Sequence, residues 1–161
     1  MIRPMLPQDI PRVAEIHVFC QRISYRNTVP NAFLFGKMSV ATRMKYFADR
    51  LQDDEGFVYD NDFIKAFLTL GPCEDPDKPD SFEVYRIFVD HFFANQGIGK
   101  LLASHSEAVA RKHGYNEICL WALECNTNAH AFYRKIGYKL DGERRISGYF
   151  NVPELRFVKQ V

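Results

Sequence analysis

The chain has 161 residues and a net charge of +1, from 21 basic and 20 acidic side chains. The length fits one domain, 1–161, and the 47% of hydrophobic residues excludes a disordered chain. Because the charges balance, we expect no nucleic-acid partner. Because no run approaches the ~20 apolar residues that cross a membrane, we expect no membrane partner. The first residues do not resemble a signal peptide, so we expect a cytoplasmic location.

The first half of the chain predicts one short strand, two helices and a meander of strands. We expect a strand over Ile2–Pro4, a helix with Asp9 as its N-cap, and a second helix capped by Ser39. Strand-like runs follow at residues 57–59, 63–70 and 82–89. The segment 71–80 contains three prolines, which indicates a long hairpin connection between the last two of these strands.

The second half alternates between helices and strands. A helix over 98–113 closed by Gly114 precedes an apolar strand over 118–123, and a helix over 128–136 closed by Gly137 follows. Two final strands are expected at 138–146 and 155–158. This order predicts an α/β (mixed α+β) fold, with a mixed sheet covered by helices on both faces.

The most informative turn follows the strand over 82–89. Residues 89–102 read V-D-H-F-F-A-N-Q-G-I-G-K-L-L, so two glycines open a helix. The free N–H groups and positive dipole of a helix start bind anions such as pyrophosphate. Ala94 and Leu101 exclude a P-loop, and Leu102 excludes the dinucleotide fingerprint. Alone, the turn is also compatible with a tight connection that binds nothing.

A second segment, residues 120–138, reads L-W-A-L-E-C-N-T-N-A-H-A-F-Y-R-K-I-G-Y. Together the two segments strongly resemble the GNAT superfamily of acetyl-CoA-dependent N-acetyltransferases, in a bacterial subgroup of unassigned substrate. The family signature N-x-x-A-x-x-[FL]-Y-x-x-x-G-[FY] is matched in full, and the resemblance extends over the whole chain. In the loop motif [RQ]-x-x-G-x-[GA], however, the first position is Ala94, which implies weakened cofactor binding.

The resemblance implies a GNAT-like, mostly antiparallel sheet of six to seven strands, with acetyl-CoA as co-substrate. The backbone of Phe88 and Val89 would pair with pantetheine, and the turn 95–100 would hold the pyrophosphate. Asn126 would hydrogen-bond the pantetheine amides. The implied cofactor-binding residues are Phe88, Val89, Asn95, Gln96, Gly97, Ile98, Gly99, Lys100, Asn126, Ala129 and Tyr133.

Transfer of an acetyl group to an amine requires a neutral amine and a protonated leaving thiolate. At pH 7 only about one alkylamine in a thousand is neutral. Glu83 is the candidate general base, and Tyr133 occupies the family's position for the general acid. Glu124 is a second candidate base or a structural residue, and Tyr25 and Trp121 are candidates for the acceptor pocket beside Glu83 and Glu124.

The leading hypothesis is therefore an N-acetyltransferase acting on a small-molecule or peptide amine by direct attack in a ternary complex. The alternative is a non-catalytic acyl-CoA-binding or regulatory domain of the same fold, which Ala94 favours and Tyr133 disfavours. The sequence has no C-x-x-C pair, and its five histidines show no metal-ligand spacing, so we expect no metal. We expect the four cysteines to be small buried hydrophobic residues. The resemblance also allows a homodimer.

Overall fold

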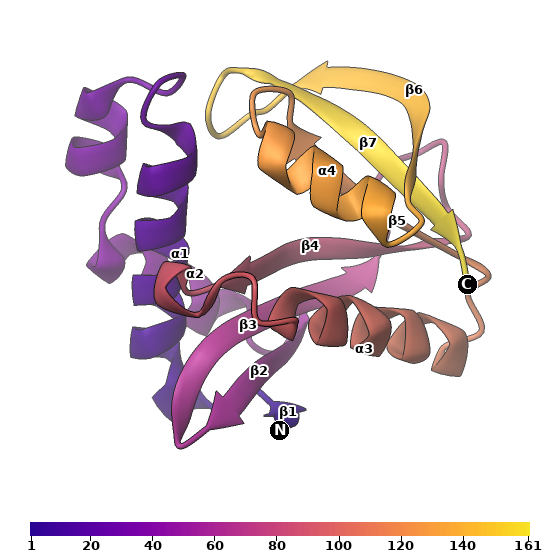
Figure 1. Ribbon diagram of the computed structural model, residues 1–161, viewed down its shortest axis with the longest axis horizontal. Helices are drawn as coiled ribbons and strands as arrows, with labels where there is room; N and C mark the ends of the chain where they lie inside the picture. Colours follow the sequence, from indigo (N-terminus) through magenta and orange to yellow (C-terminus); the bar gives the residue numbers. More distant parts are fainter.

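A seven-stranded sheet runs through the molecule in the order β1-β2-β3-β4-β5-β7-β6 (Figure 1). The computed structural model describes residues 1–161. Five of the six neighbouring pairs are antiparallel, and only β4 and β5 are parallel, as expected for a mixed, mostly antiparallel sheet. The strands are β1 (Ile2–Pro4), β2 (Glu55–Asn61), β3 (Phe63–Pro72), β4 (Ser81–Val89), β5 (Glu117–Leu123), β6 (Lys139–Ile146) and β7 (Pro153–Gln160).

Helices cover both faces of this sheet. One face carries α1 (Ile10–Tyr25) and α2 (Val40–Arg50), and the other carries α3 (Ile98–Lys112) and α4 (Thr127–Lys135) (Figure 1). The expected order of strands and helices is confirmed. A π-helix over Ala32–Lys37 and two short 3-10 helices, Pro7–Asp9 and His91–Phe93, were not expected. No helix has the length and apolar character needed to span a bilayer.

The sheet separates two main cores. Phe82, Leu102 and Phe157 belong to the core beneath α3 and α4. Val13 and Phe67 belong to the core beneath α1 and α2. Because β3 is covered on both sides, residues 66–71 are all buried, which explains why this segment is apolar except for Thr69.

The two expected helix caps differ. Ser39 accepts a hydrogen bond from the Thr42 N–H at 3.1 Å and caps α2 as predicted. Asp9 stands at the N-cap position of α1, but its carboxylate instead accepts bonds from Arg3 and the Leu6 N–H. The guanidinium of Arg3 is the stronger partner because both groups are charged, so Asp9 ties α1 to β1.

The feature that positions the site is the divergence of β4 and β5. The two strands pair only over Ser81–Glu83 and 117–119, although β4 continues to Val89 and β5 to Leu123. An extra residue, Tyr85, bulges out of β4 where its register with β3 shifts. A gap in the sheet follows, and side chains from both faces can meet there.

Candidate active site

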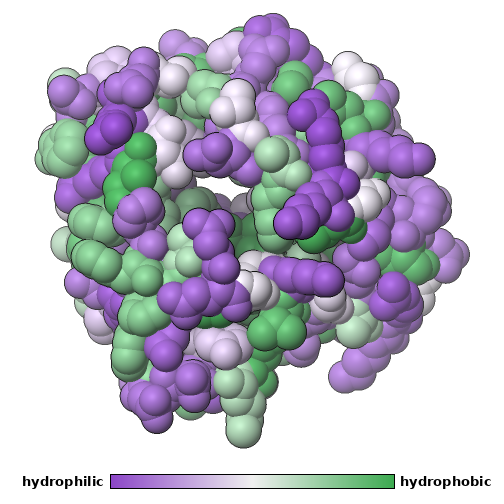
Figure 2. All heavy atoms as spheres, in the orientation of Figure 1, coloured by the Kyte–Doolittle hydropathy of each residue, from purple (hydrophilic) through white to green (hydrophobic).

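A cavity of about 1060 Å³ occupies the gap between β4 and β5. Figure 2 shows the molecule hollowed near the middle of the face seen there. Val89, Ile98 and Tyr133 line the cavity from the face of α3 and α4, whereas Gln21, Arg43 and Arg86 line it from the face of α1 and α2. The cavity therefore reaches through the sheet, and two molecules could enter it from opposite faces.

The start of α3 forms one wall of the cavity. Gly97 is the N-cap with φ 82°, and Asn95 has φ 62°, so the turn uses the left-handed region twice. The Leu101 N–H donates to the Gly97 carbonyl, and the N–H groups of the preceding helical residues remain free for a ligand. A Cβ at Gly99 would lie 3.3 Å from the Phe132 ring, which explains the second glycine by close packing of α3 on α4.

The free edge of β4 forms a second wall. The Asp90 N–H donates to the Lys65 carbonyl on β3, at 2.8 Å. Since backbone groups of successive strand residues point to alternate edges, Ile87 and Val89 direct theirs toward the gap. The Val89 carbonyl accepts a bond from the Cys20 thiol at 3.2 Å. Phe88, also expected to offer its backbone, directs it to β3 instead, and only its side chain faces the cavity.

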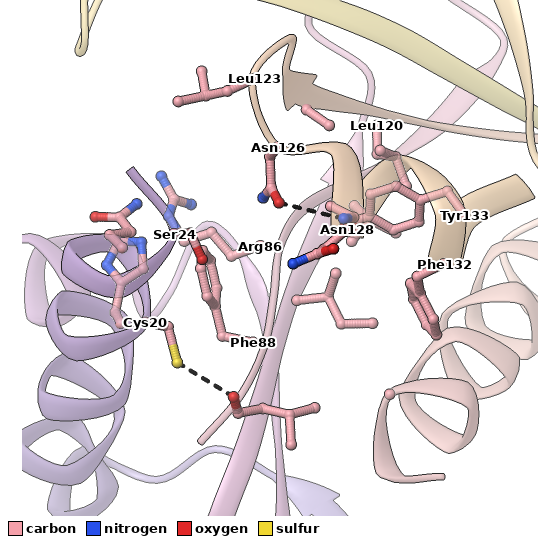
Figure 3. Close-up of a pocket in the computed structure, with 18 of the residues that line it drawn as sticks. Cys20, Ser24, Arg86, Phe88, Leu120, Leu123, Asn126, Asn128, Phe132 and Tyr133 are labelled. Atoms are coloured by element: carbon pink, nitrogen blue, oxygen red, sulfur yellow. Dashed lines mark hydrogen bonds between the residues drawn. The ribbon is translucent and has the colours of Figure 1, made fainter. Parts of the chain in front are cut away.

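The third wall is the start of α4, opposite Cys20, Ser24, Arg86 and Phe88 in Figure 3. The Asn126 side-chain carbonyl accepts the Ala129 N–H at 3.3 Å, so its NH₂ group can donate to Tyr25 and, with its second hydrogen, to a ligand. The Tyr133 ring packs against Tyr138 and Phe157, and the residue lines the cavity. Burial raises the pKa of Tyr133, with no hydrogen bond opposing the shift.

Tyr25 lies close to this wall and lines the cavity, and its expected role in the acceptor pocket stays a prediction. Its side chain is buried, and its pKa is raised by burial and by the neighbouring Tyr133 hydroxyl group, while Asn126 opposes the shift. Trp121 also lines the cavity. Its indole N–H donates to Asp75 at 2.8 Å, and the Arg145 guanidinium stacks 3.8 Å above its ring.

Three of the expected site residues do not line the cavity: Glu83, Gln96 and Glu124. Glu124 is exposed and forms an ion pair with Arg144 at 3.0 Å. Glu83 lies where β4 still pairs with β5, opposite Cys119. Burial and the charge of Asp75 raise the pKa of its carboxyl group. The physical reason for both displacements is local: an ion pair holds Glu124, and the remaining sheet pairing covers Glu83.

The environment of Glu83 also groups two cysteines that the sequence separates. The Sγ atoms of Cys73 and Cys119 are 3.3 Å apart, and ligand atoms of both thiols and of Glu83 lie within 4.8 Å of one another. The hydrogen bond with the Cys73 thiol and, after it, burial raise the pKa of Cys119. These three groups are one fewer than a structural zinc site takes, and the expected absence of a metal stays a prediction.

Several cavity residues escaped the sequence interpretation. They are His17 and Gln21 of α1, Arg43 of α2, Arg86 of β4 and Glu154 of β7. Four of the five come from the face of α1 and α2, and no local motif joins them. One signal was present: His17 and Gln21 are polar residues four apart on the apolar face of a helix.

Comparisons with known proteins agree with this geometry. A family model described as the acetyltransferase (GNAT) family matches residues 23–138. An uncharacterized N-acetyltransferase of Bacillus subtilis, YuaI, is 24% identical over 136 residues, covering 78% of this chain and 72% of that protein. Another, MJ1207 of Methanocaldococcus jannaschii, is 31% identical over 85 residues, covering 53% of this chain and 34% of that protein.

Solved structures share the fold over the whole chain. The PaiA N-acetyltransferase of Thermoplasma acidophilum, determined with coenzyme A, has a TM-score of 0.78 at 18% identity and covers 100% of this chain and 98% of its own. A GCN5-related N-acetyltransferase of Rhodopseudomonas palustris has a TM-score of 0.80 at 20% identity, with 100% and 95% covered. The chain belongs to the acetyltransferase (GNAT) family and is an acetyl-CoA-dependent acyltransferase.

Proposed function

We propose that this protein moves an acetyl group from acetyl-CoA to the primary amine of a small molecule or peptide, by direct attack within a ternary complex. The observation that carries the proposal is the cavity through the sheet, lined from both faces at the gap between β4 and β5. A thioester entering along α3 and an amine entering along α1 would meet there, with no need for an acetylated protein side chain.

The donor would bind along the α3 and α4 face. Its pyrophosphate would lie over the first turn of α3, held by backbone N–H groups, because Ala94 offers no side-chain contact. Pantetheine would pair with the free backbone of Ile87 and Val89 like an added strand. The NH₂ group of Asn126 would donate to a pantetheine carbonyl from the opposite side. A free N–H group on the β4 edge would polarise the thioester carbonyl.

Replacing Gly97 with Val tests the pyrophosphate site. A β-branched side chain is strained at the φ of 82°, and it would also stand where backbone and phosphate meet. We expect the affinity for acetyl-CoA to fall at least tenfold, about 1.4 kcal/mol, as measured by calorimetry.

Gly114→Val is the matched control for this strain. Gly114 has φ 83° and ends the same helix, but it lies at the end of α3 away from the cavity. Both variants should lose similar stability, and only Gly97→Val should lose acetyl-CoA affinity. Equal affinity in the two variants would remove the pyrophosphate from this turn.

In the proposed reaction the amine nitrogen bonds to the thioester carbon, and the C–S bond then breaks. The leaving thiolate takes the proton of the Tyr133 hydroxyl group, and the ammonium formed on attack loses a proton to a base. Glu154 is the one carboxylate that lines the cavity, and its Oε1 lies 2.7 Å from the Arg145 Nε. We propose that Glu154 accepts this proton through water, in the place expected of Glu83.

The two glutamates are separated by a pair of variants. Glu154→Gln should lower kcat/KM for a basic alkylamine by roughly tenfold, less than a directly bonded general base contributes, because water also carries the proton. The loss should shrink as pH rises and the neutral amine becomes abundant. Glu83→Gln should leave the pH profile unchanged. The opposite ranking, with the larger pH-dependent loss in Glu83→Gln, would restore Glu83 as the base.

The function itself is tested by measuring CoA release with a panel of amines and identifying the acetylated product by mass spectrometry. Direct attack predicts intersecting initial-velocity lines and no acetyl group on the protein after incubation with acetyl-CoA alone. Parallel lines with an acetylated protein would contradict the ternary complex. Acetyl-CoA binding without turnover of any amine would favour the alternative, a non-catalytic acyl-CoA-binding or regulatory domain.

A further inference from the structure

Arg43 of α2 carries a buried positive charge without a counter-ion. The residue is only 7% exposed, its Nε has no hydrogen-bond partner, and no carboxylate lies within ion-pair distance of it. Its guanidinium carbon lies 4.1 Å from the centre of the Tyr149 ring, which contributes a weak cation–π contact. An unpaired buried charge is costly, and its pKa is lowered by burial and by Arg86.

Arg86 of β4 places a second guanidinium beside it. Arg86 donates to the Tyr46 hydroxyl at 2.5 Å and lies 3.9 Å from Asp54. Asp54, however, is held at 2.7 Å by Arg50, which has only the exposed Glu74 as a further partner, at 3.5 Å. The guanidinium groups of Arg50 and Arg86 therefore share one buried carboxylate, and Arg43 has none. Figure 3 shows Arg86 at the cavity, on the side of Cys20 and Ser24.

Unpaired polar atoms gather on this same side. Four buried side-chain atoms of the chain lack a hydrogen-bond partner: His17 Nδ1, Gln21 Oε1, Arg43 Nε and His105 Nε2. The first three belong to residues that line the cavity from α1 and α2. The pKa of His17 is lowered well below its usual value by burial and by Arg86 and Arg43, so the ring is a neutral hydrogen-bonding group beside the two cations.

The cavity as a whole carries an excess of positive charge, although the chain is nearly neutral. Its lining includes Arg43, Arg86, Lys100 and Lys135 against the single carboxylate Glu154, which Arg145 already neutralises. Lys100 and Lys135 lie at α3 and α4, on the proposed donor side. Arg43 and Arg86 lie on the opposite face of the sheet, so the CoA phosphates at α3 do not account for them.

We propose that the acceptor amine carries an anionic group, a carboxylate or a phosphate, which binds between Arg43 and Arg86 at the α1 and α2 side of the cavity. This inference rests on the proposed function and names the substrate class of the same site. The planar guanidinium fork matches the oxygens of either anion, and low exposure strengthens the contact. Gln21 and His17 would donate to or accept from the rest of the acceptor.

The test compares matched amines with and without the anion. The pairs are 4-aminobutanoate with butylamine, 3-aminopropyl phosphate with propylamine, and L-leucine with L-leucinamide. In the unmodified protein, kcat/KM should be higher for the anionic member of at least one pair. The pair that responds, and competitive inhibition by acetate or by inorganic phosphate, distinguishes a carboxylate from a phosphate.

Two variants assign the preference to the arginines. Arg43→Gln and Arg86→Gln should each lower the ratio of kcat/KM between the anionic and neutral members about 10- to 100-fold, the range for hydrogen bonds to charged groups. Arg43→Lys keeps the positive charge but not the planar guanidinium fork, so its kcat/KM ratio should lie between those of the unmodified protein and Arg43→Gln. Arg26→Gln, at an exposed arginine outside the cavity, should keep the ratio of the unmodified protein. Melting curves would verify that the variants are folded.

Two results would overturn the inference. The first is equal kcat/KM for the two amines within all three pairs. The second is an Arg43→Gln variant whose kcat/KM falls by the same factor for the anionic and the neutral amine. If the KM for acetyl-CoA rose by the same factor by which kcat/KM for the amine fell, the arginines would be assigned to acetyl-CoA binding instead. If no amine releases CoA, the proposed function fails by itself. Calorimetry of 4-aminobutanoate and 3-aminopropyl phosphate binding to the acetyl-CoA complex then decides: binding lost in Arg43→Gln supports the anion site, and no binding overturns it.

Discussion

Replacement of Tyr133 by Phe should lower kcat by about 10²-fold and leave the affinity for acetyl-CoA nearly unchanged. The ring would still pack on Tyr138 and Phe157, so the wall of the cavity would keep its shape. The hydroxyl group is what disappears, and burial keeps its pKa raised, so in the native protein it is protonated throughout the neutral range. It can therefore give its proton to the thiolate as the C–S bond breaks.

The leaving group supplies the decisive comparison for Tyr133. An acyl donor whose thiol has a lower pKa needs less protonation to leave, so the defect of Tyr133→Phe should shrink with such a donor. An equal loss for good and poor leaving groups would show that the hydroxyl only positions the sulfur. Native turnover in Tyr133→Phe would exclude the tyrosine from the reaction altogether. Steady-state kinetics with acetyl-CoA and with an activated thioester measure both.

The local structure of the proposed donor side could be predicted from the sequence because it is built from consecutive residues. Gly97 needs its left-handed backbone to start α3, and Asn126 caps α4 three residues before the Ala129 N–H it accepts. Such local requirements appear in the sequence as motifs at fixed spacing. The caps at Ser39 and Gly114 were predictable for the same reason.

The proposed acceptor side could not be predicted, since it depends on how distant elements pack. Arg43 and Arg86 come from α2 and β4, and nothing in their local sequence joins them. Glu83 shows the converse case: its expected role as base stays a prediction, but its position differs from the one that the sequence suggested. Its place near the start of β4 suggested the cavity, but the gap opens only beyond the three residue pairs that join β4 to β5. Where two parallel strands separate is set by their register and the bulge at Tyr85, and no motif records it.

Arg156→Met should destabilise the protein by about 3–5 kcal/mol, the cost of removing one partner from a buried ion network. Arg156 is 2% exposed and binds three carboxylates: Asp75 at 3.0 Å, Asp77 at 2.5 Å and Asp141 at 2.7 Å. Without it, Asp75 would remain buried and less well compensated. The free energy of unfolding from urea titration would measure the loss.

Arg145→Met is the matched control, because Arg145 binds the other oxygen of Asp75 from a half-exposed position, 2.8 Å away. Water screens this contact and the ion pair of Arg145 with Glu154, so removing Arg145 should cost no more than about 1 kcal/mol for each pair, about 2 kcal/mol in all. Arg156→Lys should lie nearer to Arg156→Met, because an ammonium cannot span three carboxylates as the guanidinium does. If Arg156→Met and Arg145→Met lost the same free energy of unfolding, water would screen the ion pairs of Arg156 as strongly as those of the half-exposed Arg145. The loop 73–80, which carries Asp75 and Asp77 over Trp121 and Glu83, would then be held by its own turns instead of by Arg156.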